Sequence, residues 1–345
     1  MIKPKRPVDL RIETLRGFAI LGVVCNHISL WMIAALNKSN IEPGMASNIL
    51  MFFMEFFSPL RMPLFTVISG WVYALMPVNK ENIKRFLLSK IRRIIIPLFF
   101  ISTVLFFVTG LVTSLYPSLG GLRGPELSPL EFWKTWFYHF GHLWFLQAIV
   151  VLFIVLAVID LLGAMAHFRH WLIWLAATSL FYFMFPDDIE FWSLSKTKAI
   201  LPFFIFGVGL NRFEEQIFSS ALIKFIGPAV VALLVLKYID RPWIITRHDW
   251  PLTLLIGTLA PVYLLSLNLT FKPLIRVGKY SYTIYLYHGL PWIFLSSLGL
   301  ELIAAGSQLG YIVMFLASGL LFPVVTEMIG SKIPYLRTPL LGKKP

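Results

Sequence analysis

Residues 11–36, RIETLRGFAILGVVCNHISLWMIAAL, decide the fold of this chain. From Leu15 onward the stretch is apolar over a length that crosses about 30 Å of hydrocarbon as an α-helix. Within it, Arg16 and His27 stand eleven residues apart. At about 100° per residue this spacing returns to within about 20° of the same face and separates the two side chains by roughly 16 Å along the axis. We therefore predict a membrane-spanning helix that carries two ionisable groups on one face.

The whole chain has the composition of a membrane protein. Of its 345 residues 58% are hydrophobic and 14% are charged, and the mean hydropathy is +0.78. The single cysteine, Cys25, excludes a disulfide framework. The net charge of +13 does not indicate nucleic-acid binding, because the basic residues flank apolar stretches. The basic N-terminus precedes an apolar stretch of spanning length without a cleavage signature, so we expect a retained first helix.

Apolar runs of near-spanning length recur along the chain, separated by short polar or proline-containing breaks. We count about ten of them. They lie near residues 15–36, 48–76, 87–115, 141–162, 171–185, 199–211, 221–238, 252–268, 278–298 and 309–329. Because no linker, heptad pattern or repeat divides the chain, we predict one integral membrane domain over residues 1–345: an all-α, polytopic transmembrane helix bundle.

Lysine and arginine collect on one predicted side of the bundle, which sets its orientation. That side includes both termini and residues 80–93 and 272–279, so we expect the N- and C-termini in the cytoplasm. The opposite loops carry acids such as Glu126 and Asp187. There, residues 116–140 form the longest outer loop. We expect this loop to be irregular, because of its Pro and Gly, and to offer an acceptor a place to dock.

Each ionisable group inside these helices has a functional and a structural interpretation, because its burial in lipid costs several kcal/mol. His27, near mid-membrane, suits proton transfer, and its alternative is a core histidine bonded to a neighbouring helix. Arg16 either shares in that function or extends to the cytoplasmic headgroups. Arg61, about ten residues below the outer surface, either holds an anionic group or is satisfied by carbonyls freed at Pro59 and Pro63.

Two helix ends carry further candidates. Lys90 and Arg93 are three residues apart on one predicted helix face near the cytoplasm. They either set the topology or bind the phosphates of a cytosolic donor. On the outer side Trp144 is a natural interface residue, and His139 and His142 are placed to reach an acceptor.

The ninth apolar run contains GKYSYTIYLYHG, in which Ser281, Tyr285 and His288 line one helix face. His288 is expected near the depth of His27. The chain has seven histidines but no HExxH motif, facial triad or clustered carboxylates, so we predict no metal site. Gly-rich phosphate motifs and a GxSxG nucleophile elbow are also absent from the sequence.

The opening RIETLRGFAILGVVCNH resembles that of the membrane-bound acyltransferase-3 family, in which an Arg and a His stand with ten residues between them, as Arg16 and His27 do. Five later segments resemble further landmarks of that family, in the same order: LRMPLFTVISGW, SKIRRIIIPLF, HLWFLQAIVVLF, LPFFIFGVGL and GKYSYTIYLYHG. Several of these segments look most like the branch that includes glucan succinyltransferases. Two residues depart from the pattern: Glu13 stands where the family usually has Asp, and Lys90 stands where Arg often begins an Arg-x-x-Arg pair.

The resemblance implies an O-acyltransferase of the bacterial inner membrane. It implies transfer of an acetyl or succinyl group from cytosolic acyl-CoA to a hydroxyl of a cell-envelope carbohydrate, a glycan or glycolipid, with no permanently bound cofactor. The expected roles follow the predicted depths of the side chains. Arg16, Lys90 and Arg93 would hold the donor, His27, Arg61 and His288 would carry the chemistry, and His142, Trp144 and Tyr285 would bind the acceptor.

Two other functional classes stay open at this point. Midplane charges beside Pro and Gly breaks also describe a transporter or flippase for polysaccharide or small molecules, although no inverted repeat is visible. A third interpretation is a non-catalytic partner of a polysaccharide synthase. The expected partners are acyl-CoA, a glycan or glycolipid acceptor and membrane lipid, without nucleic acid. The sequence leaves the oligomeric state open, a homo-oligomer included.

Overall fold

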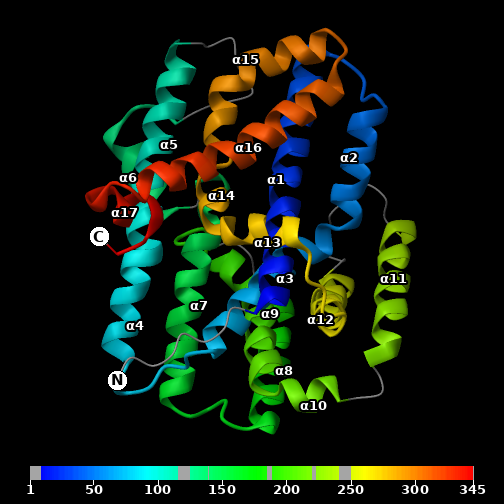
Figure 1. Cartoon of the computed structure of the whole chain (residues 1–345), viewed down its shortest axis with the longest axis vertical. Coiled ribbons are helices and arrows are strands. Elements are labelled where there is room, and N and C mark those ends of the chain that lie inside the picture. Colours follow the sequence, from blue (N-terminus) through cyan, green and yellow to red (C-terminus); the bar gives the residue numbers. More distant parts are fainter. Residues whose placement is uncertain are drawn as a thin grey trace.

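The computed structural model describes residues 9–115, 125–138, 140–184, 189–219, 223–240 and 250–344. Most of these residues are helical, and their one β feature is an isolated bridge between Tyr138 and Phe191. The helices are α1 (Leu10–Ser39), α2 (Met45–Phe56), α3 (Ser58–Ala74), α4 (Ile83–Lys90), the π-helix η1 (Ile91–Ile95), α5 (Ile96–Leu115), α6 (Pro129–Phe137), the 3-10 helix η3 (Gly141–Leu143), α7 (Trp144–Leu161), α8 (Phe168–Met184), α9 (Leu194–Arg212), α10 (Glu214–Phe218), α11 (Ile223–Asp240), α12 (Trp250–Ser266), α13 (Lys272–Lys279), α14 (Ser281–Tyr287), α15 (Leu290–Ala304), α16 (Gln308–Gly330) and α17 (Pro334–Leu341). In Figure 1, α4 and α5 form one long edge of the molecule, α11 forms the opposite edge, and α1 runs between them.

The described part of every apolar run found in the sequence is predominantly helical, so the all-α prediction is confirmed for the described residues. Within the part of the chain that the structure describes, four continuous helical stretches are long and apolar enough to cross a membrane: Leu10–Ser39, Ile83–Leu115, Gly141–Leu161 and Gln308–Gly330. Two bent helix pairs raise this number to six if each pair is one span. Ten spans are not reached by this measure, because an apolar run reports hydropathy and not the length of the helix that contains it.

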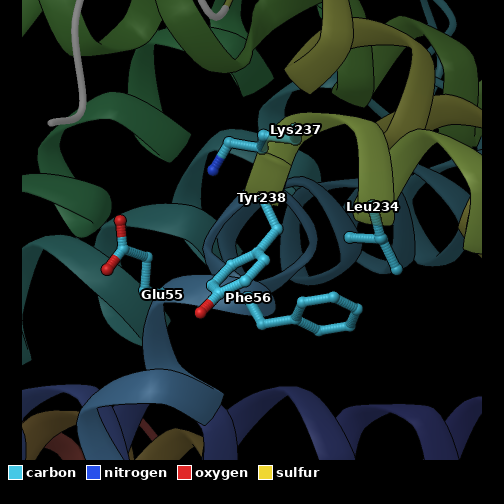
Figure 2. A pocket seen from close by; sticks show the side chains of 5 residues that line it. All are labelled: Glu55, Phe56, Leu234, Lys237 and Tyr238. Carbon is cyan, nitrogen blue, oxygen red and sulfur yellow. The ribbon is translucent and has the colours of Figure 1, made fainter. Parts of the chain in front are cut away.

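Both bent pairs break just before a proline. The axes of α2 and α3 differ by 54° at Phe57, and those of α14 and α15 differ by 57° at His288 and Gly289. Pro59 and Pro291 lie in the first turns of α3 and α15. A proline is tolerated there, because an N–H at that position would have no partner within the helix, but its ring prevents the preceding helix from continuing. Runs 48–76 and 278–298 are therefore interrupted. Beside the first break, α2 and α11 leave a cleft between them (Figure 2).

The predicted outer loop contains a helix. Within residues 116–140, which were expected to be irregular, α6 extends from Pro129 to Phe137. Ser128 caps it, since its hydroxyl accepts a hydrogen bond from the backbone N–H of Glu131 at 3.3 Å. The sequence Ser-Pro-x-Glu is a recognisable helix start that the prediction overlooked. Residues 116–124 and 139, including the candidate His139, lie outside the described residues.

Glycines allow two helix pairs to cross at backbone contact. A side chain at Gly17 of α1 would collide with the carbonyl of Leu274 of α13, and one at Gly278 would collide with the carbonyl of Glu13. The crossing of α3 with α9 is built in the same way around Gly70. Small residues at such crossings are typical of membrane bundles, where close van der Waals packing replaces the hydrophobic effect between helices.

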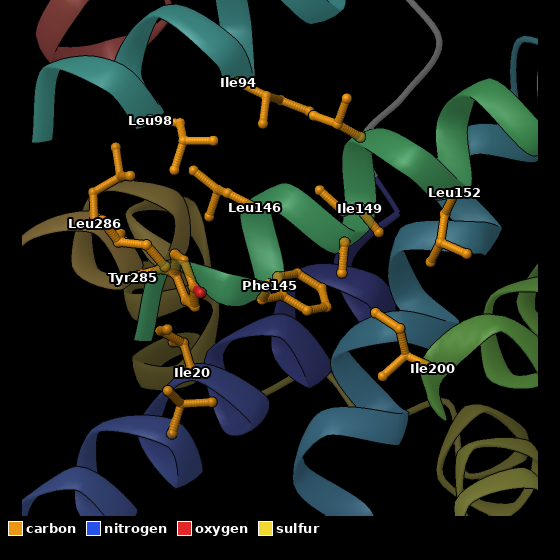
Figure 3. Close-up of a cluster of buried hydrophobic side chains, with 14 of the residues drawn as sticks. Ile20, Ile94, Leu98, Phe145, Leu146, Ile149, Leu152, Ile200, Tyr285 and Leu286 are labelled. Carbon is orange, nitrogen blue, oxygen red and sulfur yellow. The ribbon is translucent and has the colours of Figure 1, made fainter. Parts of the chain in front are cut away.

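A buried apolar cluster joins the helices around α7 (Figure 3). Ile20 of α1, Leu98 of α5 and Ile200 of α9 are at most 4% exposed. Phe145 of α7 packs edge-to-face against Tyr285 of α14, with 5.8 Å between the ring centroids. Tyr285 therefore belongs both to this core and to the group of polar residues described next.

A buried ion network ties α3, α7 and α9 together at the other end of α7. The carboxylate of Asp160 accepts hydrogen bonds from Arg212 Nη2 at 2.8 Å and from the hydroxyl of Tyr73 at 2.7 Å. The side chain of Asp160 is 5% exposed. Sequence reasoning missed it, although an acid inside the apolar run 141–162 is the kind of signal that marks a paired or functional group.

Candidate active site

Three histidines from distant parts of the chain meet in one group. His27 lies in α1, His142 lies in η3 at the start of α7, and His288 lies at the bend between α14 and α15. The Nδ1 atom of His27 is 2.8 Å from Nε2 of His288. The ring of His142 lies 4.5 Å from that of His288 and 5.9 Å from that of His27, measured between centroids. The sequence placed His27 and His288 at one depth, but it placed His142 apart from them at the outer end of its helix.

The hydrogen bonds assign the protons of this pair. Nδ1 of His288 faces the carbonyl oxygens of Ile284 and Tyr285 at 2.9 and 3.1 Å, and carbonyls only accept, so Nδ1 carries the proton. In the neutral ring, Nε2 of His288 is then an acceptor, and Nδ1–H of His27 donates to it. This leaves the lone pair of His27 on Nε2. His27 is thereby oriented as a base whose opposite nitrogen is held by a second residue.

Two contacts from α14 fix the position of His142. The hydroxyl of Tyr285 donates to the backbone carbonyl of His142. Nε2–H of His142 points at the carbonyl of Leu286, 3.4 Å away. On the other side, Trp292 packs edge-on against His288 with 5.2 Å between centroids and is fully buried. The bend of α14 into α15 therefore presents His288 between a tryptophan and two other histidines.

Arg61 brings a positive charge to the same region. It lies in the first turns of α3, directly after the bend at Phe57, and its aliphatic stem faces Gly22 of α1. Its charge acts on the His27 imidazole. The Nη1 atom of Arg61 is buried and has no hydrogen-bond partner among the described residues. A buried donor without a partner is costly, and a bound anionic group or a developing oxyanion would satisfy it.

The residues predicted to hold the donor are differently placed. Arg16 forms an ion pair with Glu13 at 2.7 Å and is about a quarter exposed. Lys90 is turned inward, with its Nζ 3.3 Å from the ring centroid of Phe153, whereas Arg93 is exposed. The π-helix Ile91–Ile95 begins between the two residues, and its i→i+5 turns shift the α-helical register there.

Trp144 stands slightly apart from the histidines. Its ring lies 5.3 Å from Nζ of Lys196 of α9, a cation–π contact. Gln147, one turn further along α7, donates to the carbonyls of Trp136 and Tyr138 and accepts from Ser193. Gln147, which sequence reasoning also missed, therefore holds the segments on both sides of η3 in place.

The three histidines are not arranged as a metal site. Zn–N bonds are about 2.0–2.1 Å, so a shared metal cannot lie between two nitrogens that directly face each other at hydrogen-bond distance. Across the described parts of the chain, no group of three or more His, Cys, Asp or Glu is placed to hold a metal ion. The geometry instead provides an oriented imidazole base beside an unsatisfied guanidinium, a combination suited to acyl transfer.

Comparison with known proteins identifies the family of the chain. The match to the family model described as an acyltransferase domain begins at the cap of α1 and ends near the end of α16, so it includes every residue of the histidine group and Arg61. Comparison with curated proteins and with solved structures finds no match. Because the matched region, residues 9–328, covers most of the 345 residues, the chain belongs to the acyltransferase-3 family of membrane acyltransferases.

Proposed function

We propose that this protein transfers an acetyl or succinyl group from cytosolic acyl-CoA to a hydroxyl of a cell-envelope carbohydrate, in the inner membrane of a bacterium. The observation that carries the proposal is the His27–His288 pair together with the buried Nη1 of Arg61, which has no hydrogen-bond partner among the described residues. A base and an oxyanion-stabilising cation are the two groups that O-acyl transfer requires. The reaction modifies a polysaccharide or its glycolipid precursor, as O-acetylation or its succinyl equivalent.

In the direct route, Nε2 of His27 removes the proton of the acceptor hydroxyl as its oxygen attacks the thioester carbonyl. Arg61 stabilises the tetrahedral oxyanion. When the intermediate collapses, the C–S bond breaks, the ester forms and the thiolate of CoA takes the proton from the His27 imidazolium. His288 keeps the imidazole oriented by accepting from Nδ1–H throughout.

In the covalent route, Nε2 of His27 attacks the thioester carbonyl and the C–S bond breaks, which leaves an acyl-imidazolium that keeps its Nδ1–H and the thiolate of CoA. The acceptor hydroxyl then attacks the acyl carbon, the C–N bond breaks to restore neutral His27, and the hydroxyl proton passes to the thiolate directly or through water. Both routes use the same lone pair and the same oxyanion partner. They differ in whether an acylated enzyme accumulates when the acceptor is absent.

The donor and acceptor are proposed to approach the pair from opposite sides. The exposed Arg93 and the Glu13-paired Arg16 are the proposed contacts for the donor's phosphates, and the inward position of Lys90 gives it a packing role instead. His142, Tyr285 and Trp144 are proposed to border the acceptor. The finer topology of ten spans with both termini in the cytoplasm stays part of this proposal. It can be tested by labelling single cysteines placed in the loops.

A gene-deletion strain tests the function as a whole. Mass spectrometry of the surface glycans should show that the polymer persists and that an ester mass is lost, and expression of the wild-type chain should restore that mass. Loss of the entire polymer would instead favour a transporter or a partner of the polymer's synthase. Unchanged glycans, with no activity of the purified protein on acyl-CoA, would contradict the proposal.

A further inference from the structure

Helix α14, which brings His288 to the active site, is short and interrupted at both ends. It has seven residues, and no side chain caps its N-terminus with a hydrogen bond. Tyr280 separates it from α13, and a bend of 57° separates it from α15. Isolated helices shorter than about 12–15 residues are marginal, so contacts with other elements must hold α14 in place.

The imidazole of His288 is fixed to this helix. Its Nδ1–H donates to the carbonyls of Ile284 and Tyr285, which both belong to α14, so the ring moves with the helix. Its Nε2 faces Nδ1 of His27 at 2.8 Å. Hydrogen bonds from N–H groups are rarely longer than about 3.2 Å, so a displacement of α14 by about 1 Å would break the bond between the two histidines.

Side-chain hydroxyls of α14 donate hydrogen bonds to four other elements. Three of the acceptors are backbone carbonyls: Tyr282 donates to Arg93 in η1, Tyr285 to His142 in η3 and Tyr287 to Leu340 in α17. The fourth hydroxyl, that of Thr283, donates to the carboxylate of Glu327 in α16 at 2.5 Å. Among these four contacts only the last has a charged acceptor, and hydrogen bonds to charged groups are roughly twice as strong as neutral ones.

Glu327 is an acid near the C-terminal end of the apolar helix α16, which passes α14 and leads to α17 (Figure 1). Its side chain is 13% exposed, and its other oxygen pairs with Nζ of Lys343 at 2.7 Å. An ionisable side chain in an apolar helix is costly and is therefore a functional candidate by default. Lys343 compensates the charge and holds one carboxylate oxygen, which leaves the other directed at Thr283.

We infer that Glu327 is a positioning residue for acyl transfer: through Thr283 it holds α14 where the ring of His288 meets that of His27. The inference rests on the proposed function. Lys343 is the third member of this chain of contacts, and through it the segment after α17 contributes to the geometry of the active site. If the contact only tied α16 to α14, its loss would lower Tm and leave the kcat of the folded protein unchanged.

The kinetic test uses two variants of Thr283 that differ by one hydroxyl. Thr283→Val removes the hydroxyl at nearly constant volume, and Thr283→Ser keeps it. A catalytic group misplaced by about 1 Å can cost about 10²-fold in rate, so Thr283→Val should lower kcat about ten-fold or more with little change in the KM for acyl-CoA. Thr283→Ser should stay near wild type. Thr326→Val is the matched control, because its hydroxyl donates to the carbonyl of Phe322 within α16.

The assay follows release of CoA thiol with the unesterified surface glycan of the deletion strain as acceptor, at a temperature below the Tm of every variant. Glu327→Gln keeps an acceptor oxygen for Thr283 and should be more active than Glu327→Leu. Equal kcat values for Thr283→Val and Thr326→Val would overturn the inference. So would equal losses in Thr283→Val and Thr283→Ser, because the hydroxyl would then not be the cause.

A spectroscopic measurement separates this inference from the proposed function, because it needs no substrate. In protein with isotopically labelled histidine, the Nδ1–H of His27 should be protected from exchange by its bond to His288, and its resonance is identified by its loss in His27→Ala. Thr283→Val should shift or remove this resonance, whereas Thr326→Val should retain it.

The two measurements together have distinct outcomes. An unchanged resonance in Thr283→Val, with acyl transfer by the wild type, would overturn the inference and leave the proposed function standing. A changed resonance in Thr283→Val, with no acyl transfer by the wild type, would contradict the proposed function and the role of Glu327 in it, and would leave a structural contact between α14 and α16.

Discussion

Nδ1 of His27 lies 2.8 Å from Nε2 of His288, although 261 residues separate the two in the chain. The bond joins the middle of α1 to the bend between α14 and α15. Because His288 is only 1% exposed and donates its other N–H to carbonyls of its own helix, it can act only as an acceptor toward His27 while neutral. The base and the residue that orients it are therefore supplied by opposite ends of the sequence.

Replacement of His27 should nearly abolish acyl transfer. Loss of a general base lowers rates by about 10²- to 10⁴-fold, so we expect His27→Ala to reduce kcat in this range, measured as release of CoA thiol in the presence of acceptor. His170→Ala is the control, because this histidine is exposed on α8. Activity of His27→Ala within two-fold of the His170→Ala variant would rule out His27 as base or nucleophile.

The effect of replacing His288 on kcat should depend on whether the new side chain still offers a hydrogen-bond acceptor to His27. His288→Ala leaves Nδ1–H of His27 without its partner, so kcat should fall, whereas His288→Gln offers an amide oxygen to the same N–H and should retain more activity. The ratio of the two kcat values is the measurement. A merely structural role for the ring would make the two variants equally inactive or equally active.

Replacement of Arg61 should affect the transition state more than substrate binding. Loss of one oxyanion donor typically costs about 10²- to 10³-fold in kcat, which we expect for Arg61→Met with a smaller change in KM. Arg61→Lys keeps the charge but not the planar donor, so its kcat should lie between those of wild type and Arg61→Met. Arg169→Met, at an exposed position of α8, is the control. A wild-type kcat in Arg61→Met would return this arginine to a structural role.

Replacement of Asp160 should destabilise the fold. Asp160→Ala leaves the half-buried Arg212 and the Tyr73 hydroxyl without their acceptor, and breaking a buried pair costs about 3–5 kcal/mol. We expect a clear fall in Tm, measured by the tryptophan fluorescence of the protein in detergent. Glu131→Ala removes an exposed ion pair with Lys134 and should cost less than about 1 kcal/mol. Equal Tm values for the two variants would show that the Asp160 network is not stabilising.

The all-helical fold and the family were legible in the sequence because they depend on local properties. In lipid every backbone polar group must be satisfied within its own segment, so an apolar run of sufficient length predicts a helix wherever it packs. The motif that contains Arg16 and His27, with the later segments, predicted the acyltransferase-3 family, and this prediction is confirmed. The equal depths proposed for His27 and His288 also followed from counting residues along their helices.

The composition of the site was decided by the tertiary structure. His142 joins His27 and His288 at the bend between α14 and α15, and Lys90 packs on Phe153 beside the start of a π-helix. Both features depart from the straight helices that the sequence predicts. The cleft between Glu55 and Lys237 depends on how α11 packs against α2. Sequence by itself determined which segments are helices and which family they form, since hydropathy and helical period act within a segment. Contacts between segments depend on bends and crossing points, which arise only when all the helices are packed together.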